Sequence, residues 1–329
     1  MSTIAERSSL NQNIQLGVEA IPGTAVAANK RLQSIGIEPS ISVEMSNFRP
    51  IGSKFNALST LGKEWVEASI SGRGTYTEIQ YVLSSVMTTA VTTTTAGATE
   101  WVFTPANRSD DTPKTFTVEH GSAVRADRFT YGLLTEIGMT FNRDSIELSG
   151  SMMGRALEDG ITMTASGVTS PPLIPILPTQ VSVYLDDDFA DLGTTKLTRL
   201  ISGEFSLGSR FGPVWVVDAA NPSFVNHIET EPDLTVALTL QADSQGMGLL
   251  QTLRQGDTKF LRIEAIGTEI GTTGTPHRFC IDMAIKISDT GGFSDADGVY
   301  AIEFTALGVN DTGWDKAVEV TVVNELTAL

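Results

Sequence analysis

Apolar and polar residues alternate along most of the chain. The longest such stretch runs from Ile35 to Met45, where every second residue is apolar. Successive side chains of a β-strand point to opposite faces of the sheet, so this period of two indicates strands with one buried face. We therefore predict a mostly β fold. The same pattern recurs at Val66–Ile70, Phe116–Val118, Ile137–Phe141, Ile146–Leu148, Ile201–Leu207, Leu234–Leu240, Phe260–Ala265, Phe279–Ile287 and Val299–Phe304.

Two segments repeat their apolar residues at helical spacing instead. The first is Thr77–Val86, where Ile79, Val82, Leu83 and Val86 follow the capping candidates Thr75 and Thr77. The second is Met247–Leu253. We expect one short helix in each half of the chain. Between the alternating stretches, Asn142, Arg143 and Asp144 predict a hairpin turn, the segment Ser288–Gly298 predicts a longer hairpin loop, and the Thr-rich segment Val91–Thr99 predicts an exposed loop.

The order of these elements repeats once along the chain. Three pairs of matching positions are each 168 residues apart, namely Ser34 and Ser202, Ile70 and Leu238, and Val82 and Leu250. A constant offset close to half the chain length is typical of a tandem duplication. Chance agreement between two antiparallel β domains is the alternative, because the match lies in pattern more than in residue identity.

A proline-rich stretch separates the two copies. It contains Pro171, Pro172, Pro175 and Pro178. Proline removes a backbone donor and fixes the backbone, so the stretch favours a stiff, extended connection. The predicted organisation is therefore an N-terminal arm (1–30), a first domain (31–166), a linker (167–178) and a second domain (179–329), each domain a β-sandwich or barrel with one short helix.

Composition and charge narrow the classes of function. The 329-residue chain is 41% hydrophobic, which favours a folded protein, and its formal net charge is −17. Binding to nucleic acid normally depends on lysine and arginine, so a protein that grips DNA is not expected. An acidic wall would instead let a polyanion slide past, and the plainer alternative is that the charge only keeps the protein soluble.

Cysteine content and the terminal segment bear on the compartment. Cys280, the single cysteine, lies in an alternating apolar stretch, so we expect a buried free thiol in a protein made in a reducing cytoplasm. Residues Met1–Leu10 carry Glu6 and Arg7 with no apolar core behind them, so we expect no secretory signal. No apolar run is long enough to cross a bilayer, and we expect no membrane partner.

Signals for catalysis or metal binding are weak. The histidines His120, His227 and His277 lack metal-ligand spacing and are expected on the surface. The densest acidic cluster, Asp186–Asp188 with Asp191, lacks the alternating ligands of a calcium loop and is expected to be a solvated loop. We predict no catalytic residue, no metal site and no cofactor.

The stretch Asn13–Leu32 resembles the opening of siphophage major tail tube proteins. Its segments Gly17-Val18-Glu19, Pro22-Gly23-Thr24 and Ala25–Ala28 stand in the order in which that family places similar features before its first long strand. The resemblance continues over most of the chain, through Trp65–Val86, Thr135–Gly154, Val181–Tyr184 and Leu197–Leu207.

The resemblance implies a structural role without catalysis. Members of the family assemble into stacked rings that form the tail tube, the conduit through which phage DNA passes without specific binding. A chain with two fused copies implies trimeric rings of pseudo-sixfold symmetry. The implied partners are further copies of the chain, the tape measure protein and other tail proteins, and the implied location is the virion tail after synthesis in the host cytoplasm.

The N-terminal arm is a candidate contact with a neighbouring subunit or ring. Its apolar residues have no period long enough for a helix, so they would gain from packing on a partner. A partly disordered tail is the alternative. On the first reading, deletion of residues 1–30 should abolish assembly and leave a folded protomer. The residues proposed for this contact are Leu16, Val18, Ile21, Pro22 and Val26.

Three other functions stay open on the sequence. The first is another virion component, such as a tail terminator or decoration protein. The second is a carbohydrate-binding β-sandwich adhesin that presents Trp101, Trp215 or Trp314, although the first two lie in strand-like patterns that favour core packing. The third is a hydrolase with Asp186–Asp188 as metal carboxylates, for which no histidine or second acidic motif completes a site.

Overall fold

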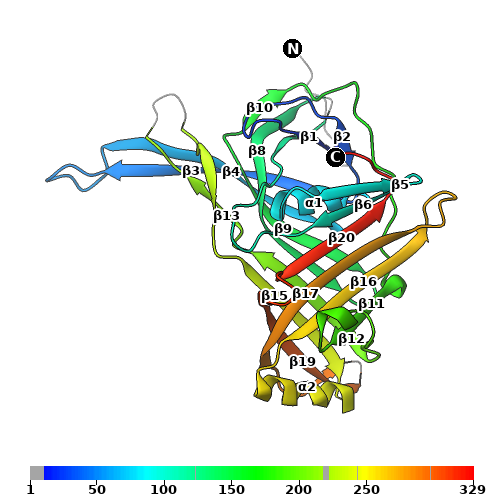
Figure 1. Cartoon of the computed structure of the whole chain (residues 1–329). Coiled ribbons are helices and arrows are strands. Elements are labelled where there is room, and N and C mark those ends of the chain that lie inside the picture. The colour runs from blue at the N-terminus through cyan, green and yellow to red at the C-terminus, as the bar shows by residue number, and fades with distance from the viewer. Residues whose placement is uncertain (1–10, 123, 218–221, 243, 297) are drawn as a thin grey trace.

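The structure, a computed structural model, describes residues 11–122, 124–217, 222–242, 244–296 and 298–329. The first ten residues of the predicted arm therefore lie outside the described residues. The described chain consists mostly of antiparallel strands and contains two α-helices, so the predicted mostly β fold is confirmed (Figure 1).

Among the described residues of the first half there is one α-helix, α1 (Ile79–Val86), and it falls within the predicted helical segment. Thr75 Oγ1 accepts the backbone N–H of Glu78 at 3.2 Å, just before the helix begins. The predicted turn joins β8 to β9, where Asn142 Oδ1 accepts the N–H groups of Asp144 and Ser145 at 2.8 and 3.0 Å. The strands of this half are β1 (Asn13–Val18), β2 (Lys30–Leu32), β3 (Ile35–Phe48), β4 (Leu58–Arg73), β5 (Val91–Thr95), β6 (Ala98–Phe103), β7 (Phe116–Gly121), β8 (Ala126–Phe141), β9 (Ile146–Gly154) and β10 (Glu158–Ile161).

The second half begins after the proline-rich stretch. Its helix, α2 (Ser244–Gln255), covers the predicted segment Met247–Leu253. Two short 3-10 helices, η2 (Pro178–Gln180) and η3 (Phe189–Asp191), flank its first strand. The strands are β11 (Val181–Asp186), β12 (Leu200–Gly208), β13 (Phe211–Val214), β14 (Asn226–Glu229), β15 (Asp233–Gln241), β16 (Lys259–Glu269), β17 (Pro276–Thr290), β18 (Ser294–Ala296), β19 (Val299–Gly308) and β20 (Val318–Asn324).

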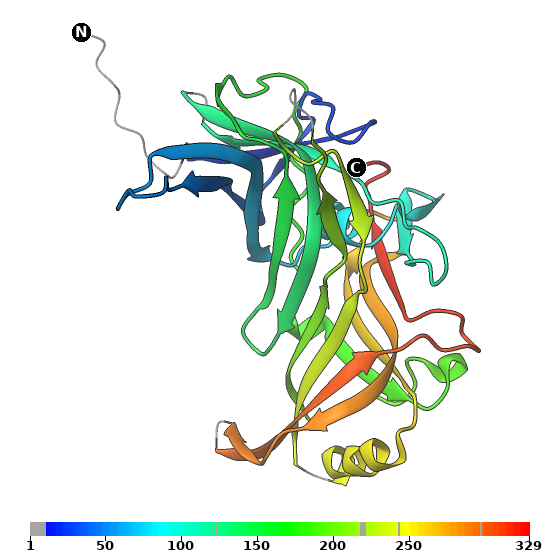
Figure 2. The same ribbon diagram turned by 90° about the vertical axis from the view of Figure 1, so that its left-hand side faces the viewer.

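One continuous antiparallel sheet runs through both halves (Figure 2). Its strands follow the order β3–β4–β9–β8 and then β12–β15–β19–β17–β16–β11. The halves meet where Ile137–Phe141 of β8 pair with Gly203–Leu207 of β12. The strands β7 and β10 pair with the N-terminal part of β8, and β20 pairs with the N-terminal part of β17.

The same strand order occurs twice. The first half pairs β3–β4–β9–β8–β7–β1, and the second pairs β12–β15–β19–β17–β16–β11. Ile70 and Leu238 lie on the equivalent strands β4 and β15, and Val82 and Leu250 lie on α1 and α2. With Ile70 and Leu238 equivalent, the registers make Ile37 the counterpart of Gly203, so the offset between β3 and β12 is 166 and the match of Ser34 with Ser202 is not kept. The offset changes again after the helices because the hairpin β5–β6 is inserted only in the first half. The predicted domain limits stay a prediction, because strands of both halves share one sheet.

The hydrophobic core lies on the inner face of this sheet and extends through both halves. Alternate residues of each strand point into it, among them Ile37, Ile70, Phe205 and Val236. Helix α1 is buried along its whole length. Burying one such large apolar side chain contributes about 1.5–3 kcal/mol, so this shared core stabilises the two halves together.

The predicted exposed loop Val91–Thr99 is instead largely a hairpin. Its strands β5 and β6 are joined by Ala96 and Gly97, whose φ angles of 53° and 94° suit a two-residue turn. The prediction of a loop was wrong because β-branched threonines favour a strand. The strand β6 then pairs with β20 of the second half. The side chains of β5 are exposed, as predicted.

Candidate assembly surfaces

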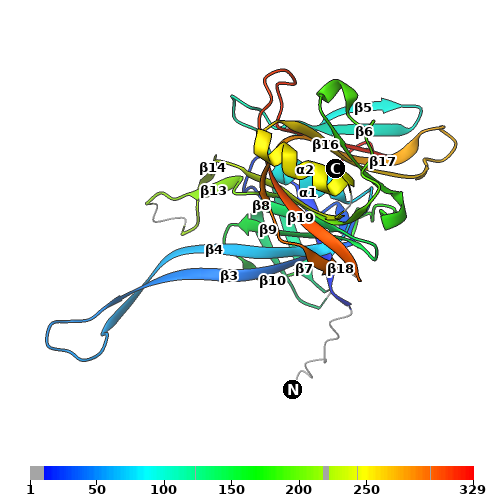
Figure 3. The same cartoon turned by 90° about the horizontal axis from the view of Figure 1, so that it is seen from below.

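A long hairpin formed by β3 and β4 leaves the body of the molecule (Figures 1 and 3). Nearly all of its residues between 41 and 64 are exposed. Eight large apolar side chains on this segment are between 45% and 106% exposed. A soluble monomer seldom exposes so many apolar side chains together, so this surface is a candidate contact with another molecule. The eight are Ile41, Val43, Met45, Phe48, Ile51, Phe55, Leu58 and Leu61.

Part of this surface continues the core face of the sheet. Ile35 and Ile37 of β3 are buried, and Ile41, Val43 and Met45 follow at the same two-residue period. Across the hairpin, Leu61 pairs with Met45. The alternation therefore predicts the strand correctly, but no described residue covers the side chains beyond the body. We call this the hairpin face: Ile41, Val43, Met45 and Leu61.

The outer face of the sheet has a different character. Six exposed glutamates lie on it, with small residues between them. The register places Glu38 opposite Ser69, Glu136 opposite Ser151, and Glu303 opposite Thr239. Arg73, at the end of β4, also stands at an outward position, where it lies opposite Glu147. We call this surface the glutamate face: Glu38, Glu67, Glu136, Glu147, Glu204 and Glu303.

The glutamate face crosses the junction between the two halves. Thr140 of β8 pairs with Glu204 of β12, and Gly138 pairs with Ser206. Serine and threonine have short side chains and glycine has none, so the wall at this junction is smooth as well as acidic. The negative charges of these glutamates give a negative potential that repels a polyanion, and the repulsion weakens as the salt concentration rises.

The apolar residues predicted to form an N-terminal contact are divided by the structure. Leu16 lies in the core at 3% exposure, and Val18 packs against the same core. Ile21 and Pro22 are exposed, and Val26 is half-buried. Strand β1, which carries Leu16, pairs with β2 and β7. Residues 13–18 are therefore part of the sheet and no separate arm, and a contact with a neighbour stays a prediction for the exposed residues.

A buried carboxylate ties the following turn to the body. Glu19 accepts hydrogen bonds from the Gly23 and Tyr131 N–H groups at 2.6 and 2.9 Å. It also accepts the hydroxyls of Thr115 and Thr117 at 2.8 and 2.9 Å. The segment that carries the family resemblance is thereby held in place by this acid.

The acidic cluster in the second half has a comparable role. Asp186, at the end of β11, accepts the N–H groups of Gly193, Thr194 and Thr195 and the hydroxyl of Thr194. Burial alone would raise the pKa of Asp186, but these hydrogen bonds lower it below its usual value. Asp188 accepts the N–H of Ala190 and begins η3. Asp186 is only 4% exposed, so the prediction of a solvated loop was wrong for this residue. The loop that follows wraps around its carboxylate.

The three histidines differ in their surroundings. The prediction that all lie on the surface was wrong for His277, which is 3% exposed and bonds Thr268 O and Glu325 Oε2, both at 2.8 Å. His227 is half-buried and bonds the Tyr131 hydroxyl at 2.8 Å, and burial lowers its pKa. His120 is partly exposed on β7. Within the described ranges, no group of three or more His, Cys, Asp or Glu side chains could hold a metal ion.

The tryptophans proposed for sugar binding have their ring faces occupied or buried. Trp101 is 5% exposed, as its strand pattern predicted. Lys63 Nζ lies 5.1 Å from the ring centroid of Trp215, and Lys316 Nζ lies 5.6 Å from that of Trp314. Cys280 is a buried free thiol, as expected, and burial raises its pKa.

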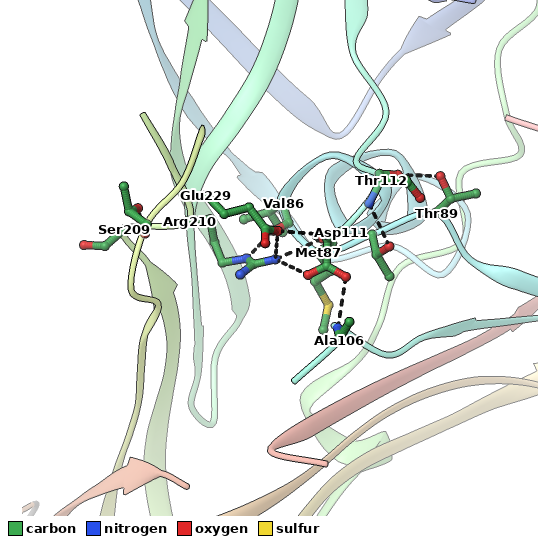
Figure 4. A network of polar contacts seen from close by, with 11 residues as sticks. Val86, Met87, Thr89, Ala106, Asp111, Thr112, Ser209, Arg210 and Glu229 are labelled. Atoms are coloured by element: carbon green, nitrogen blue, oxygen red, sulfur yellow. Dashed lines mark hydrogen bonds and ion pairs between the residues drawn. The ribbon is translucent and has the colours of Figure 1, made fainter. Parts of the chain in front are cut away.

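A buried ion pair joins the two halves (Figure 4). Arg210 of the second half donates Nε to Val86 O at 3.0 Å and a terminal nitrogen to Met87 O at 3.2 Å, at the end of α1. The same nitrogen lies 2.6 Å from Asp111 and 3.5 Å from Glu229. The pKa of Glu229 is raised, chiefly by its burial. The cation thus satisfies the helix end and two carboxylates at once.

No protein-family model matches this chain, and no curated protein was found to be similar to it in sequence. Among the described helices, neither α1 nor α2 is long and apolar enough to cross a membrane.

Proposed function

We propose that this chain is a structural protein that polymerises with its own copies into a hollow tube. The observation that carries the proposal is the hairpin face, where a strand pattern typical of a core continues beyond the protein's own core. Burying large apolar side chains of this kind contributes about 1.5–3 kcal/mol each, which favours association. Copies of the chain are the partner because the resemblance to tail tube proteins implies self-assembly.

The glutamate face supports a role as a conduit. It is broad, acidic and lined with short side chains, and it is a continuous surface of the sheet through both halves. DNA held by a protein normally contacts lysine and arginine. The paired outward positions between β3 and β19 carry six glutamates against one arginine, Arg73. If copies close into a tube with this face inward, DNA would pass along the lumen without being held.

The phage setting of the proposal rests on sequence. The resemblance of Asn13–Leu32 and of the later segments to siphophage tail tube proteins favours the major tail tube protein of a long-tailed phage. In that setting the protein forms stacked rings of the virion tail, with three two-copy chains in each ring, and meets the tape measure protein and other tail proteins.

Assembly of the purified protein tests the proposal. Sedimentation and negative-stain microscopy should show rings or hollow filaments. The double variant Met45→Ser/Leu61→Ser, which removes apolar side chains from the hairpin face, should raise the concentration needed for assembly at least tenfold. The matched variant Ser46→Ala/Thr60→Ala, which changes neighbouring exposed positions of the same hairpin, should assemble like the wild type. A protein that stays monomeric at high concentration contradicts the proposal.

A further inference from the structure

The junction between the two halves is a template for how strand edges meet. The strand β12 pairs with β15 on one edge and with β8 on the other. In the second pairing Leu207 lies opposite Ile137, and Phe205 lies opposite Met139. An edge that would otherwise expose backbone groups is thus closed by the preceding repeat.

Strand β3 is the first-half counterpart of β12, and its matching edge is open. Ile37 pairs with Ile70 as Gly203 pairs with Leu238, so Glu38 and Ser40 correspond to Glu204 and Ser206. The Arg73 N–H bonds Ser34 O at 3.1 Å, and hydrogen-bonded pairs alternate from there. Backbone groups of Ile37, Pro39 and Ile41 therefore point away from β4, and no described strand pairs with them.

The open edge at the other end of the repeat belongs to β17 and β18. A bulge separates Leu134 from Glu136 in β8, and another separates Ile287 from Asp289 in β17. Aligning the bulges makes Thr290 the counterpart of Ile137 and Gly291 the counterpart of Gly138. The Gly291 N–H donates to Glu303 O of β19, so the backbone groups of Thr290 and Gly292 point away from β19. On that side, β16 pairs with β17 only as far as Ile285.

We propose that β3 of one copy pairs antiparallel with the β17–β18 edge, residues 290–296, of the next copy. This repeats the β8–β12 junction between molecules, and it rests on the self-assembly proposed above. The register places Ile41 opposite Thr290 and Pro39 opposite Gly292. The contact is head to tail, so each added copy presents a fresh edge, and the glutamate face continues from one copy into the next.

The two edges of one chain are far apart, so they do not pair with each other within one molecule. Because the β8–β12 junction is the template for the contact, the partner of each edge is a second copy. Six strands lie between β3 and β17, which at a spacing of about 4.8 Å separates the edges by on the order of 30 Å. Exposed apolar side chains lie beside both edges. Ile41 on β3 is 53% exposed, and Phe293 and Tyr300 beside the other edge are 63% and 77% exposed.

Two features protect these edges from other strands. Pro39 has no N–H to donate, and its nitrogen faces the open side of β3, where an edge strand tolerates proline. At the other edge the Asp289 carboxylate accepts the Thr290 N–H at 2.8 Å. Both reduce pairing with an arbitrary strand, so the matching register and apolar contacts select the partner. Pro39→Val restores the missing donor and should lower the concentration for assembly about fivefold.

Cysteine cross-linking between copies tests the register. Hydrogen-bonded antiparallel pairs have Cα atoms about 5.5 Å apart, within the range that a disulfide spans. Ile41→Cys and Thr290→Cys proteins, mixed and oxidised, should form a disulfide that contains one of each. The double variant should give a ladder of covalent oligomers. Ser40→Cys mixed with Thr290→Cys is the matched control and should link at least tenfold less, because residue 40 points to the opposite face. Buried Cys280 is replaced by serine throughout.

The outcomes separate this proposal from the proposed function. Rings or filaments that form without the 41–290 link overturn the junction and leave self-assembly standing. Links between two Ile41→Cys copies in preference to the mixed pair also overturn it, because they indicate a symmetric contact. A wild-type protein that does not associate overturns both. Circular dichroism of the reduced variants establishes that each is folded before oxidation.

Discussion

At the scale of single residues, buried charges hold the turns and the two halves in place. Glu19 follows β1, and Asp186 ends the equivalent strand β11, and each accepts the N–H groups of the turn that comes next. Arg210 performs the corresponding task between halves, because it satisfies carbonyls at the end of α1. These groups shape the loops around the sheet.

The Asp186 carboxylate gives a prediction with a pH dependence. Asp186→Asn should lower the free energy of unfolding at pH 7 by about 2 kcal/mol, because hydrogen bonds to a charged acceptor weaken. The pKa of Asp186 is lowered in the folded state, so the wild-type advantage is complete above the unfolded pKa of about 3.9 and is lost as pH falls below it. Denaturant titrations at pH 7, 5 and 3 measure this, and a difference that does not shrink at pH 3 contradicts it.

The buried ion pair of Arg210 gives a second prediction. Arg210→Met should lower the free energy of unfolding by about 3–5 kcal/mol, because Asp111 is left as a buried, uncompensated charge. Arg125→Met is the matched control, since Arg125 and its partner Asp159 are 49% and 55% exposed and such a pair contributes at most about 1 kcal/mol. Equal losses in the two variants, measured by urea denaturation, would refute the role assigned to Arg210.

At the scale of elements, the first strand decides what deletion of residues 1–30 does. The sequence predicted a folded protomer after this deletion, but β1 pairs with β7 and carries buried Leu16. We now expect Leu16→Ala to lower the free energy of unfolding by about 2–5 kcal/mol. Ile21→Ala, on an exposed residue, should change it by less than about 0.5 kcal/mol. Thermal or urea unfolding measures both, and equal losses would contradict the placement of β1.

Periodicity predicted the elements better than their surroundings. Alternation identified the long strands, and helical spacing identified α1 and α2, because each pattern reports which face of an element is apolar. It does not report what covers that face, so Ile41 and Val43 read as core residues although they project on the hairpin. His277 read as a surface residue because its partner Glu325 is far away in sequence. The glutamate face was also missed, since six strands distant along the chain must be placed side by side before it exists.

At the scale of the whole molecule, the repeat makes one sheet with two open edges and one acidic side. The repeated strand order explains the open edges, because the first repeat closes an edge of the second and leaves its own counterpart edge open. The net charge of −17 pointed to an acidic surface without locating it. The fold places six of these charges on one face.

Charge reversal on that face gives a prediction for DNA. Assembled wild-type protein should not retain double-stranded DNA. The triple variant Glu67→Lys/Glu136→Lys/Glu204→Lys should retain it in low salt and release it as salt rises, because the contacts displace counterions. The matched variant Asp110→Lys/Asp144→Lys/Asp257→Lys has the same net charge, with the changes placed in exposed loops. Equal retention by both variants, measured by co-sedimentation with DNA, would contradict a special role for the glutamate face.

The most direct test of self-assembly into a conduit is electron cryo-microscopy of the purified full-length protein at high concentration. We expect a hollow ring or tube in which the hairpin face is buried between copies and Glu67, Glu136 and Glu204 line the lumen. A solitary protomer with an exposed hairpin, or an assembly that turns the glutamate face outward, would contradict it.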